Sequence, residues 1–393
     1  MKIVQILHHS ISPFIELLPG MDALHYNSGW PMLFARAIRA HDPGIEAECW
    51  RPERTLRRPY VWKDDENVVH RVFPSLYARY GYELSPSMLR AARLAVRSPG
   101  TCFIVHGSYN PLAYLLGPIL ARAPAILQSH GGFPAPVQFR INRHRWLRWV
   151  YLFLAPWERR ALPRYPHIFA ISSEERGYLE RLVPGSRVSF SPVGMDFDLF
   201  SPGERPSARR ACGIPEDARV VLYVGRLSVE KGIESLIEAF DAVARSVGNA
   251  RLFIVGTGPL ERALRSRVDR PGLRDRVSFA GFVPNAELPK WYRAADVTVM
   301  PSDLEWFGAV GAESMACGTP LVTTQAGGAV DIVREFECGV LVPPRDAARL
   351  AEGILAVLSG SVNTTPNIGR ARASFSWPHK LAHALSLFEA MAN

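Results

Sequence analysis

Cysteine is scarce in this chain of 393 residues, and the five that occur form no CxxC pair. They also form no His/Cys cluster with the spacing of a zinc site, standing alone at positions 49, 102, 212, 317 and 338. This pattern argues against a disulfide scaffold and against a structural metal. We therefore expect a reducing, cytoplasmic setting.

Long hydrophobic runs are also missing. The two longest uncharged apolar stretches, at 111–121 and 149–157, fall far short of the roughly 20 residues that cross a bilayer. The first ten residues, MKIVQILHHS, have too short an apolar core for a signal peptide and are better interpreted as a first buried strand. We expect a protein that is not exported and does not span a membrane.

Lysine is the rare cation, with five residues against 41 arginines, and the net charge of +9 is unevenly placed. Residues 1–200 carry 24 Lys and Arg against 16 Asp and Glu, whereas residues 201–393 carry 22 against 21. Much of the excess lies in 137–165, which holds seven arginines, three tryptophans and one glutamate.

Two interpretations of the segment 137–165 stay open. Arginine with aromatic residues is typical of an amphipathic patch on an anionic membrane, which would place the protein peripherally at the inner face of the plasma membrane. Alternatively, the segment is a core helix whose arginines extend to water. Nucleic-acid binding is disfavoured, because no recognised motif accompanies the charge.

The apolar pattern predicts an α/β fold. Continuous apolar runs of strand length alternate with single amphipathic helices from about residue 219 onward, and the first half repeats the theme less regularly. This is the pattern of parallel sheets with helices on both faces. We predict two doubly wound, Rossmann-like domains, 1–195 and 196–373, joined by the Pro/Gly-rich segment 191–206. Ligand should bind at the carboxyl ends of the strands, in the cleft between the halves.

Glycine-containing turns end four strands of the second half, at 223–232, 255–259, 280–284 and 305–308. Glycine permits close approach of backbone to a ligand. In the first of these turns Arg226 and Lys231 lie five positions apart, where both can converge on one pyrophosphate. The alternative is that both are solvated surface charges.

Two glutamates flank the segment EWFGAVGAE at 305–313. A helix starting at about Gly308 would direct its free N–H groups toward a phosphate. Glu305 and Glu313 would repel a phosphate, but carboxylates accept hydrogen bonds from sugar hydroxyls. The arrangement favours a nucleotide-sugar, with a sugar at either end of a diphosphate. Alternatively, Glu313 is a helix-face residue paired with an arginine.

Six motifs in order give residues 188–346 a resemblance to a known family. The second half resembles the retaining, GT-B-fold glycosyltransferases of family 4, the "glycosyl transferases group 1" set, through motifs PVGMDFDLFSP, YVGRLSVEKGI, VGTGP, FAGFVPNAELPKWYRAADVTVMPS, EWFGAVGAESMACGTPLV and GVLVPP. The resemblance implies an N-terminal acceptor domain and a C-terminal nucleotide-sugar domain. It also implies that a C-terminal helix, 374–393, packs back onto the first domain and couples closure to donor binding.

The resemblance also assigns roles to individual residues. It implies that Arg226 and Lys231 bind the donor diphosphate, that Glu313 binds the ribose, and that Glu305 binds the transferred sugar. His130, in QSHGG at 128–132, would contact the donor sugar near the reaction centre. The remaining donor contacts are Val283 with the base and the backbone of Phe307, Gly308 and Ala309 with sugar and phosphate.

Three positions depart from the family pattern. The Gly-Gly pair that many members carry before the first long helix has only Gly20 or Gly29 as approximate substitutes, Trp306 stands at a usually small position, and Asp331 replaces a common glutamate.

The expected activity is retaining transfer of a hexose-type sugar from a UDP- or GDP-sugar to a glycan or lipid-linked acceptor. No DxD or other metal-carboxylate cluster appears in the turns that would line the cleft, and SSEE at 172–175 is interpreted as a helix start, so we expect no metal and no other cofactor. A nucleotide-sugar epimerase of the same fold and a non-catalytic nucleotide-sugar-binding protein are the alternatives.

Overall fold

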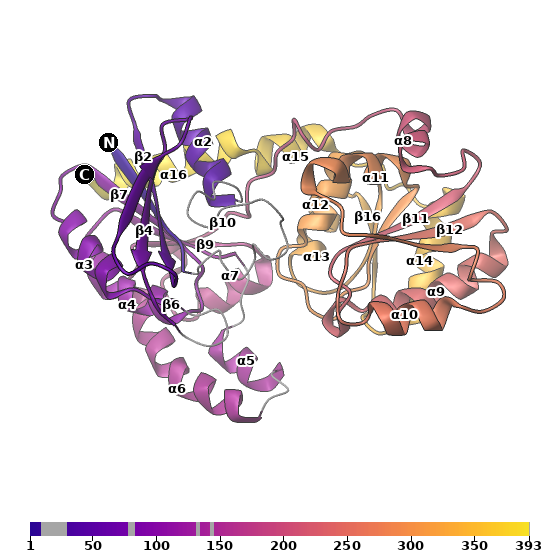
Figure 1. Ribbon diagram of the computed structural model, residues 1–393, viewed down its shortest axis with the longest axis horizontal. Helices are drawn as coiled ribbons and strands as arrows, with labels where there is room; N and C mark the ends of the chain where they lie inside the picture. Colours follow the sequence, from indigo (N-terminus) through magenta and orange to yellow (C-terminus); the bar gives the residue numbers. More distant parts are fainter. Residues whose placement is uncertain (9–29, 78–82, 131–133, 142–144, 393) are drawn as a thin grey trace. The chain divides into compact units, whose positions relative to one another are not determined.

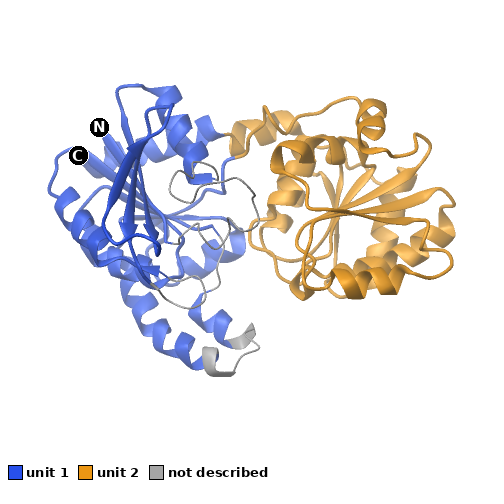
Figure 2. Cartoon of the chain, viewed as in Figure 1, with its two compact units in different colours: residues 1–194, 377–393 blue, residues 195–376 orange. Residues whose placement is uncertain are grey.

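The computed structural model describes residues 1–8, 30–77, 83–130, 134–141 and 145–392. The chain forms two compact units (Figures 1 and 2). Unit 1 comprises residues Met1–Gly194 and Trp377–Asn393, and unit 2 comprises Met195–Ser376. Each unit is an α/β layer structure built on its own sheet, as the apolar pattern predicts.

The sheet of unit 1 has eight strands in the order β10-β9-β8-β7-β1-β2-β4-β3. All neighbours pair in parallel except β3, which runs antiparallel to β4 at the edge. The order reverses direction between β1 and β7, which makes the carboxyl ends of these two strands the switch point where open sheets bind ligands. The strands are β1 (Lys2–Ile6), β2 (Glu46–Glu53), β3 (Tyr60–Lys63), β4 (Val69–Pro74), β7 (Thr101–His106), β8 (Ala125–Gln128), β9 (His167–Ala170) and β10 (Val188–Phe190).

Several helices and one short hairpin complete unit 1. The hairpin pairs β5 (Leu76–Tyr77) with β6 (Glu83–Leu84). The helices are α2 (Trp30–His41), α3 (Pro86–Ala95), α4 (Pro111–Leu120), α5 (Ala135–Ile141), α6 (Arg145–Ala161), α7 (Ser173–Leu179) and α16 (Trp377–Ala392). Ser172 caps α7 by accepting a hydrogen bond from the Glu175 amide, so SSEE does open a helix.

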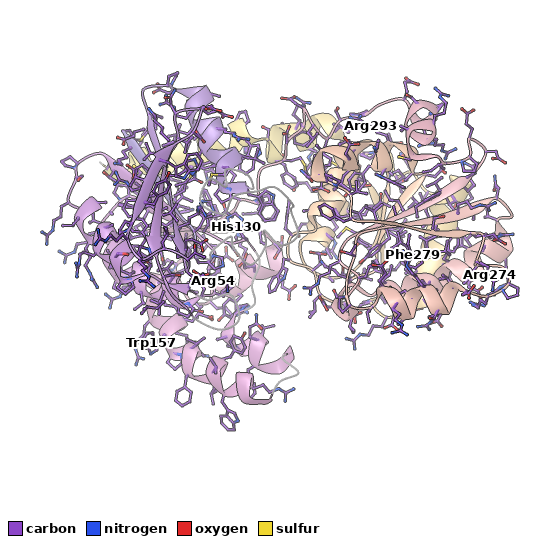
Figure 3. All side chains as sticks on the ribbon, viewed as in Figure 1. Arg54, His130, Trp157, Arg274, Phe279 and Arg293 are labelled. Carbon is purple, nitrogen blue, oxygen red and sulfur yellow. The ribbon has the colours of Figure 1, made fainter. Side chains whose placement is uncertain are left out.

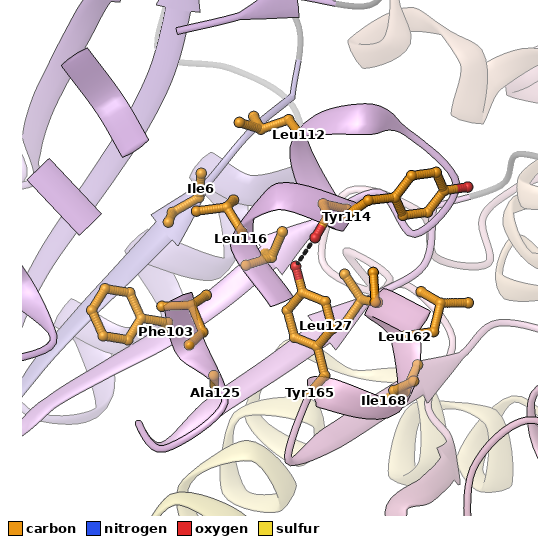
Figure 4. Close-up of a cluster of buried hydrophobic side chains, with 14 of the residues drawn as sticks. Ile6, Phe103, Leu112, Tyr114, Leu116, Ala125, Leu127, Leu162, Tyr165 and Ile168 are labelled. Atoms are coloured by element: carbon orange, nitrogen blue, oxygen red, sulfur yellow. Dashed lines mark hydrogen bonds between the residues drawn. The ribbon is translucent and has the colours of Figure 1, made fainter. Parts of the chain in front are cut away.

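The core of unit 1 lies between the sheet and α4. Phe103, Leu116, Leu127 and Ile168 are fully or almost fully buried there (Figure 4). Tyr165 is also fully buried, and its hydroxyl donates a 2.6 Å hydrogen bond to the Ala113 carbonyl of α4. A buried phenol needs such a partner, so this bond fixes α4 against the chain that leads into β9.

The C-terminal helix α16 belongs to unit 1, where it packs beside α2 (Figure 1). The Trp377 ring lies 5.9 Å from the Phe34 ring of α2, and Leu381, Ala384 and Phe388 are buried. Lys380 of the same helix is buried too. Its Nζ lies 2.5 Å from Gln128 Oε1, 2.9 Å from the Pro192 carbonyl and 3.1 Å from Ser191 Oγ.

The sheet of unit 2 has six parallel strands in the order β13-β12-β11-β14-β15-β16. The switch point lies between β11 and β14. The strands are β11 (Arg219–Val224), β12 (Ala250–Val255), β13 (Val277–Gly281), β14 (Val297–Met300), β15 (Leu321–Thr324) and β16 (Gly339–Val342). Val220 to Tyr223 of β11 are all buried, because helices cover both faces of the sheet.

The helices of unit 2 form two layers, with α9 and α14 on one face of the sheet and α11, α12 and α13 on the other (Figure 1). The bounds are α8 (Arg205–Cys212), α9 (Ile233–Ser246), α10 (Glu261–Val268), α11 (Leu288–Ala294), α12 (Ala309–Ala316), α13 (Gly328–Phe336), α14 (Ala347–Ser359) and α15 (Ile368–Phe375). Among the helices of both units, within the described residues, none combines the length and the apolar character needed to cross a membrane.

Candidate functional site

The carboxyl ends of the unit 2 strands carry the predicted donor-binding residues. Because all six strands are parallel, the loops that follow them emerge at one edge of the sheet. Val283 follows β13, Arg226 and Lys231 follow β11, and the segment 305–309 follows β14. The fold therefore gathers residues that lie up to 83 positions apart in the sequence, from Arg226 to Ala309.

The turn after β11 is held tightly in place. Gly232 has φ +62°, and a Cβ there would lie 1.9 Å from the Pro301 carbonyl oxygen, so only glycine fits. The Tyr223 hydroxyl donates to the Arg226 carbonyl at 2.8 Å, which fixes the backbone of the turn. The Arg226 side chain itself is exposed, and Lys231 is half-buried.

Glu305 is joined directly to Lys231. The lysine Nζ lies 2.9 Å from Glu305 Oε2, and the glutamate side chain is only 10% exposed. Ser302 Oγ donates to the same oxygen at 3.3 Å, whereas Oε1 accepts from the Trp306 amide at 3.0 Å. A residue predicted to bind diphosphate and one predicted to bind sugar thus form a single ion pair, which the sequence did not indicate.

The helix predicted to start at about Gly308 is confirmed as α12. Gly308 is its N-cap with φ +81°, and the first helical residue is Ala309. Glu313 lies in the second turn, where its Oε2 accepts a 2.6 Å hydrogen bond from the hydroxyl of the buried Tyr292. Burial raises the pKa of Glu313 from 4.5 to about 7. The hydrogen-bond partner of Glu313 is a phenol of α11, which does not match the alternative of a helix-face residue paired with an arginine.

Gly327 and Gly328, after β15, support the 305–308 segment and were not singled out as site residues. A Cβ on Gly327, where φ is +55°, would lie 1.7 Å from the Glu305 carbonyl oxygen. The Gly328 amide donates to the Trp306 carbonyl at 2.9 Å. The adjacent glycine pair in the sequence, directly after an apolar strand, was the signal that could have identified this contact.

The remaining donor-side residues differ in exposure. Phe307 is buried and its ring lies 6.0 Å from that of Phe375, while Val283 and Ala309 are half-buried. Trp306 and Asp331, the two departures from the family pattern in this region, are half-buried as well.

In unit 1, His130 lies just past the end of β8 (Figure 3). Its Nε2 is 2.5 Å from Nδ1 of His106, the last residue of β7, and the two rings are stacked with centroids 4.7 Å apart. His106 Nε2 lies 2.9 Å from Gln5 Oε1 of β1. His8, just past β1, contributes Nδ1 at 2.9 Å from the His106 carbonyl oxygen. Three histidines therefore meet at the switch point of this sheet.

His106 was not predicted as a site residue, although its sequence context resembles that of His130. Both are histidines at the end of an apolar strand and precede glycine, in TCFIVHG and QSHGG. The residue before His130 is also anchored, since Ser129 Oγ donates at 2.6 Å to Glu175 of α7. Gly20 and Gly29, the approximate substitutes for the N-terminal glycine pair, lie outside the described residues.

No group of three or more His, Cys, Asp and Glu in the described part of the chain could hold a metal ion. Independence from metal stays a prediction.

The arginine-rich segment forms the hairpin of α5 and α6, which projects from the body of unit 1 (Figure 1). Trp149, Phe153 and Trp157 of α6 recur every fourth residue and are 63%, 77% and 55% exposed; Figure 3 labels Trp157. Fully buried core helices do not expose such side chains, so the core-helix interpretation is wrong for this face of α6.

The inner side of the hairpin is anchored by a carboxylate. Glu158 is fully buried and accepts hydrogen bonds from the hydroxyls of Tyr114 (2.9 Å) and Tyr178 (2.5 Å) and from the Ala135 amide (2.9 Å). Between the helices lies an open groove of about 670 Å³. It is lined by Ala135, Pro136, Phe139, Tyr151, Leu152, Ala155, Pro156, Arg159 and Arg160.

Each of the two doubly wound units carries its candidate residues at the carboxyl ends of its strands, which is the plan of a GT-B protein. Residues 204–373 match the family model described as glycosyl transferases group 1, and residues 32–199 match that of glycosyltransferase family 4. The chain belongs to this family of GT-B glycosyltransferases.

Individual relatives agree with this placement. The chain is 39% identical over 165 residues to an uncharacterised glycosyltransferase of Methanocaldococcus jannaschii, covering 42% of each chain. It is 37% identical over 213 residues to a D-inositol 3-phosphate glycosyltransferase of Geodermatophilus obscurus, covering 51% of this chain and 47% of the relative. The chain thus spans about half the length of these curated relatives.

Among solved structures, sucrose-phosphate synthase from Thermosynechococcus elongatus matches with a TM-score of 0.74 and 25% identity, over 100% of this chain and 99% of that one.

Proposed function

We propose that the protein is a retaining glycosyltransferase acting without a metal. It would move a hexose-type sugar from a UDP- or GDP-sugar to a hydroxyl of a glycan or lipid-linked acceptor, in the synthesis of a cell-surface polysaccharide or glycolipid. The observation that carries the proposal is the convergence of the Lys231–Glu305 pair, the N-terminus of α12 and Glu313 at one sheet edge. Family membership supports the same class of reaction.

The Lys231–Glu305 pair suits a diphosphate beside a sugar. An ammonium group has three N–H donors, and the contact with Glu305 uses one of them. The other two are available to phosphate oxygens, and Arg226 adds a second cation from the same turn. Glu305 in turn can accept hydrogen bonds from hydroxyls of the transferred sugar, because each carboxylate oxygen has two lone pairs.

Glu313 is assigned to the ribose. The Tyr292 hydroxyl engages Oε2 of Glu313 and so fixes the orientation of the carboxyl group, which leaves Oε1 for the ribose hydroxyls. The first turn of α12 would place its amides and its positive dipole end beside the phosphates. Val283 would contact the base from the end of β13.

In the transfer step, the bond between the anomeric carbon and the phosphate oxygen breaks, and its electron pair leaves with the nucleoside diphosphate. The acceptor oxygen forms the new bond on the same face of the sugar, and its proton passes to the departing phosphate oxygen. Negative charge grows on the diphosphate, so Arg226, Lys231 and the amides of α12 stabilise the transition state. His130, from unit 1, would contact the donor sugar near the reacting carbon.

A lipid-linked acceptor is supported by the α5–α6 hairpin. Its exposed Trp149, Phe153 and Trp157 are side chains that favour the interface of a bilayer. Arg159 and Arg160 line the apolar groove beside them, where cations would pair with an anionic headgroup. We therefore place the protein peripherally on an anionic membrane surface, on the cytoplasmic side.

The donor site is tested by thermal shift and turnover with UDP-, GDP- and ADP-sugars, with and without EDTA. One nucleotide series should stabilise the wild type, and EDTA should leave turnover unchanged. Glu313→Ala should abolish the stabilisation, whereas the control Glu352→Ala, an exposed residue of α14, should retain it. The anomeric configuration of the product, read by NMR, decides between retention and inversion.

The two alternative functions predict other outcomes. An epimerase would convert the donor sugar without any acceptor. A binding protein would be stabilised by a nucleotide yet turn over no donor. Absence of any nucleotide response would contradict the proposal as a whole.

Membrane association is tested by sedimentation with vesicles. Wild type should bind phosphatidylglycerol vesicles more strongly than phosphatidylcholine vesicles, and the triple change Trp149→Ser, Phe153→Ser and Trp157→Ser should abolish binding. The matched control is Phe282→Ser, since Phe282 is an equally exposed aromatic residue of unit 2. Equal binding of all three proteins would exclude the hairpin as the membrane contact.

A further inference from the structure

A chain of hydrogen bonds in unit 1 determines where the protons of two histidines lie. It begins at the Pro31 carbonyl of α2, which accepts a 2.9 Å bond from Gln5 Nε2. A carbonyl oxygen can only accept, so this contact identifies the amide nitrogen of Gln5. The same nitrogen lies 3.5 Å from Cys49 Sγ. Gln5 Oε1 is therefore the atom that faces His106, 2.9 Å from its Nε2.

The next link fixes the proton of His106. Gln5 Oε1 has no hydrogen to donate, so His106 Nε2 must carry the proton. His106 is 5% exposed, and burial favours the neutral ring. In a neutral imidazole with its proton on Nε2, the other nitrogen is an acceptor. His106 Nδ1 thus accepts from its neighbour.

That neighbour is His130 Nε2, at 2.5 Å. We propose that His106 is a positioning residue that holds the His130 ring in the Nε2-protonated tautomer, which makes Nδ1 the acceptor nitrogen of that ring. A proton taken up at Nδ1 leaves the Gln5–His106–His130 chain intact. The part of this inference that concerns catalysis rests on the proposed glycosyl transfer.

Neighbouring groups hold the His106 and His130 rings in their stacked orientation. Trp30 stacks on His130 with centroids 5.5 Å apart, and His106 stacks on it at 4.7 Å. The backbone after His106 cannot shift easily, because Gly107 has φ +93° and a Cβ there would lie 2.5 Å from His8 Nδ1.

Ionisable groups approach the pair from three other elements. His8, after β1, contacts the His106 carbonyl, and Glu175 of α7 accepts a hydrogen bond from Ser129, the residue before His130. Lys380 of α16 lines the same small cavity as His106 and His130. Any pH titration of the pair must be interpreted with these three groups in place.

The tautomer is tested by NMR of the full chain with 15N-labelled histidine, without donor. Wild type should show His130 protonated at Nε2 through a downfield Hε2 signal that exchanges slowly with water. His106→Asn should keep this signal, because the asparagine Oδ1 takes the place of Nδ1 as acceptor. His106→Leu should lose it. A proton on His130 Nδ1, or a signal unaffected by His106→Leu, would overturn the inference.

The positioning role is tested by turnover with whichever nucleotide-sugar the donor screen selects. We expect His106→Leu to lower kcat about 30-fold with little change in KM, and His106→Asn to stay within about threefold of wild type. A purely structural role would instead lower the melting temperature of both variants and spare kcat in the folded fraction. If the wild type turns over no donor, the proposed function fails, while the NMR result still decides the tautomer.

Discussion

Glu313 combines its proposed contact with the ribose with an unusual ionisation. Burial raises its pKa to about 7, so a large share of the side chains is protonated at neutral pH. Because Oε2 already accepts from Tyr292, a proton on this carboxyl group would occupy Oε1, and only the carboxylate offers both lone pairs of Oε1 to the ribose hydroxyls. Binding of a nucleotide should therefore expel a proton from this residue.

The consequence is a pH-dependent affinity. We expect the Kd of the nucleotide to fall as pH rises from 6 to 8, by up to about tenfold per pH unit below the pKa. Calorimetry in buffers of different ionisation enthalpy would detect the released proton. Glu313→Gln should bind more weakly and show a flat profile; an equally steep profile in this variant would assign the proton to another group.

The same pKa shift also makes stability depend on pH. The stability contributed by Glu313 falls as pH rises, whereas that of an ordinary salt-bridged carboxylate increases. The folded pKa lies above 4.5, so the unfolded chain loses its proton first as pH rises. The free protein therefore loses part of its stability between about pH 4.5 and pH 7, and Glu313→Gln should lack that loss.

At the scale of elements, the segment 305–308 depends on the glycine pair that follows β15. Gly327→Ala would place a methyl group 1.7 Å from the Glu305 carbonyl oxygen, at a φ that side chains rarely adopt. We expect a loss of about 2–4 kcal/mol in the free energy of unfolding, together with weaker donor binding, because the Glu305 backbone must move.

A matched control is available for this change. Gly248 lies after α9, and a Cβ there would meet nothing within 4 Å. Gly248→Ala should change the free energy of unfolding by less than about 0.5 kcal/mol and leave nucleotide affinity unchanged. Equal effects of both substitutions in urea unfolding would show that Gly327 is not packed as described.

The elements of unit 2 could be predicted from the sequence because their signal is simple. Strands such as β11 and β12 are continuous apolar runs, and single amphipathic helices separate them. The hydrophobic period and the length of each run therefore indicate the same type of element. In unit 1 the antiparallel edge strand β3 and its neighbour β4 were missed, because YVWK and VHRVFP mix charged and apolar residues. Edge strands exposed on one side give no clear apolar run.

The site was predictable to a different extent. The segment Glu305–Glu313 and the start of α12 are local features, so the sequence indicated them directly. The Lys231–Glu305 pair and the His106–His130 contact join residues from different strands. Such contacts depend on strand order, which a single sequence does not specify.

At the scale of the whole chain, α16 returns the C-terminal residues to unit 1, and Lys380 is its buried polar anchor. Burial lowers the pKa of Lys380 from 10.5 to about 7. The unfolded chain therefore binds more protons between these values, and the stability of unit 1 should rise with pH from about 7 to 10.

Lys380→Met tests this anchor. The change leaves the Pro192 carbonyl and Gln128 Oε1 without their buried donor, which should cost about 2–4 kcal/mol near pH 9. The loss should be smaller at pH 6.5, because the wild type there bears the cost of a buried cation. The exposed control Lys63→Met should melt like wild type at both pH values, and a loss for Lys380→Met independent of pH would contradict the buried-cation argument.

Because lysine is rare in this chain, the extent to which a reagent modifies Lys231 can report on the state of the Lys231–Glu305 ion pair. Acylating reagents have only five side-chain amines to modify, and Lys380 is shielded in the interior of unit 1. Lys63 is exposed and the Lys290 side chain is 36% exposed, so both would serve as internal standards for reagent reactivity in a mass-spectrometric footprint. Occupancy of the proposed donor site could thus be followed as protection of one peptide containing Lys231, in an unlabelled and unmutated protein.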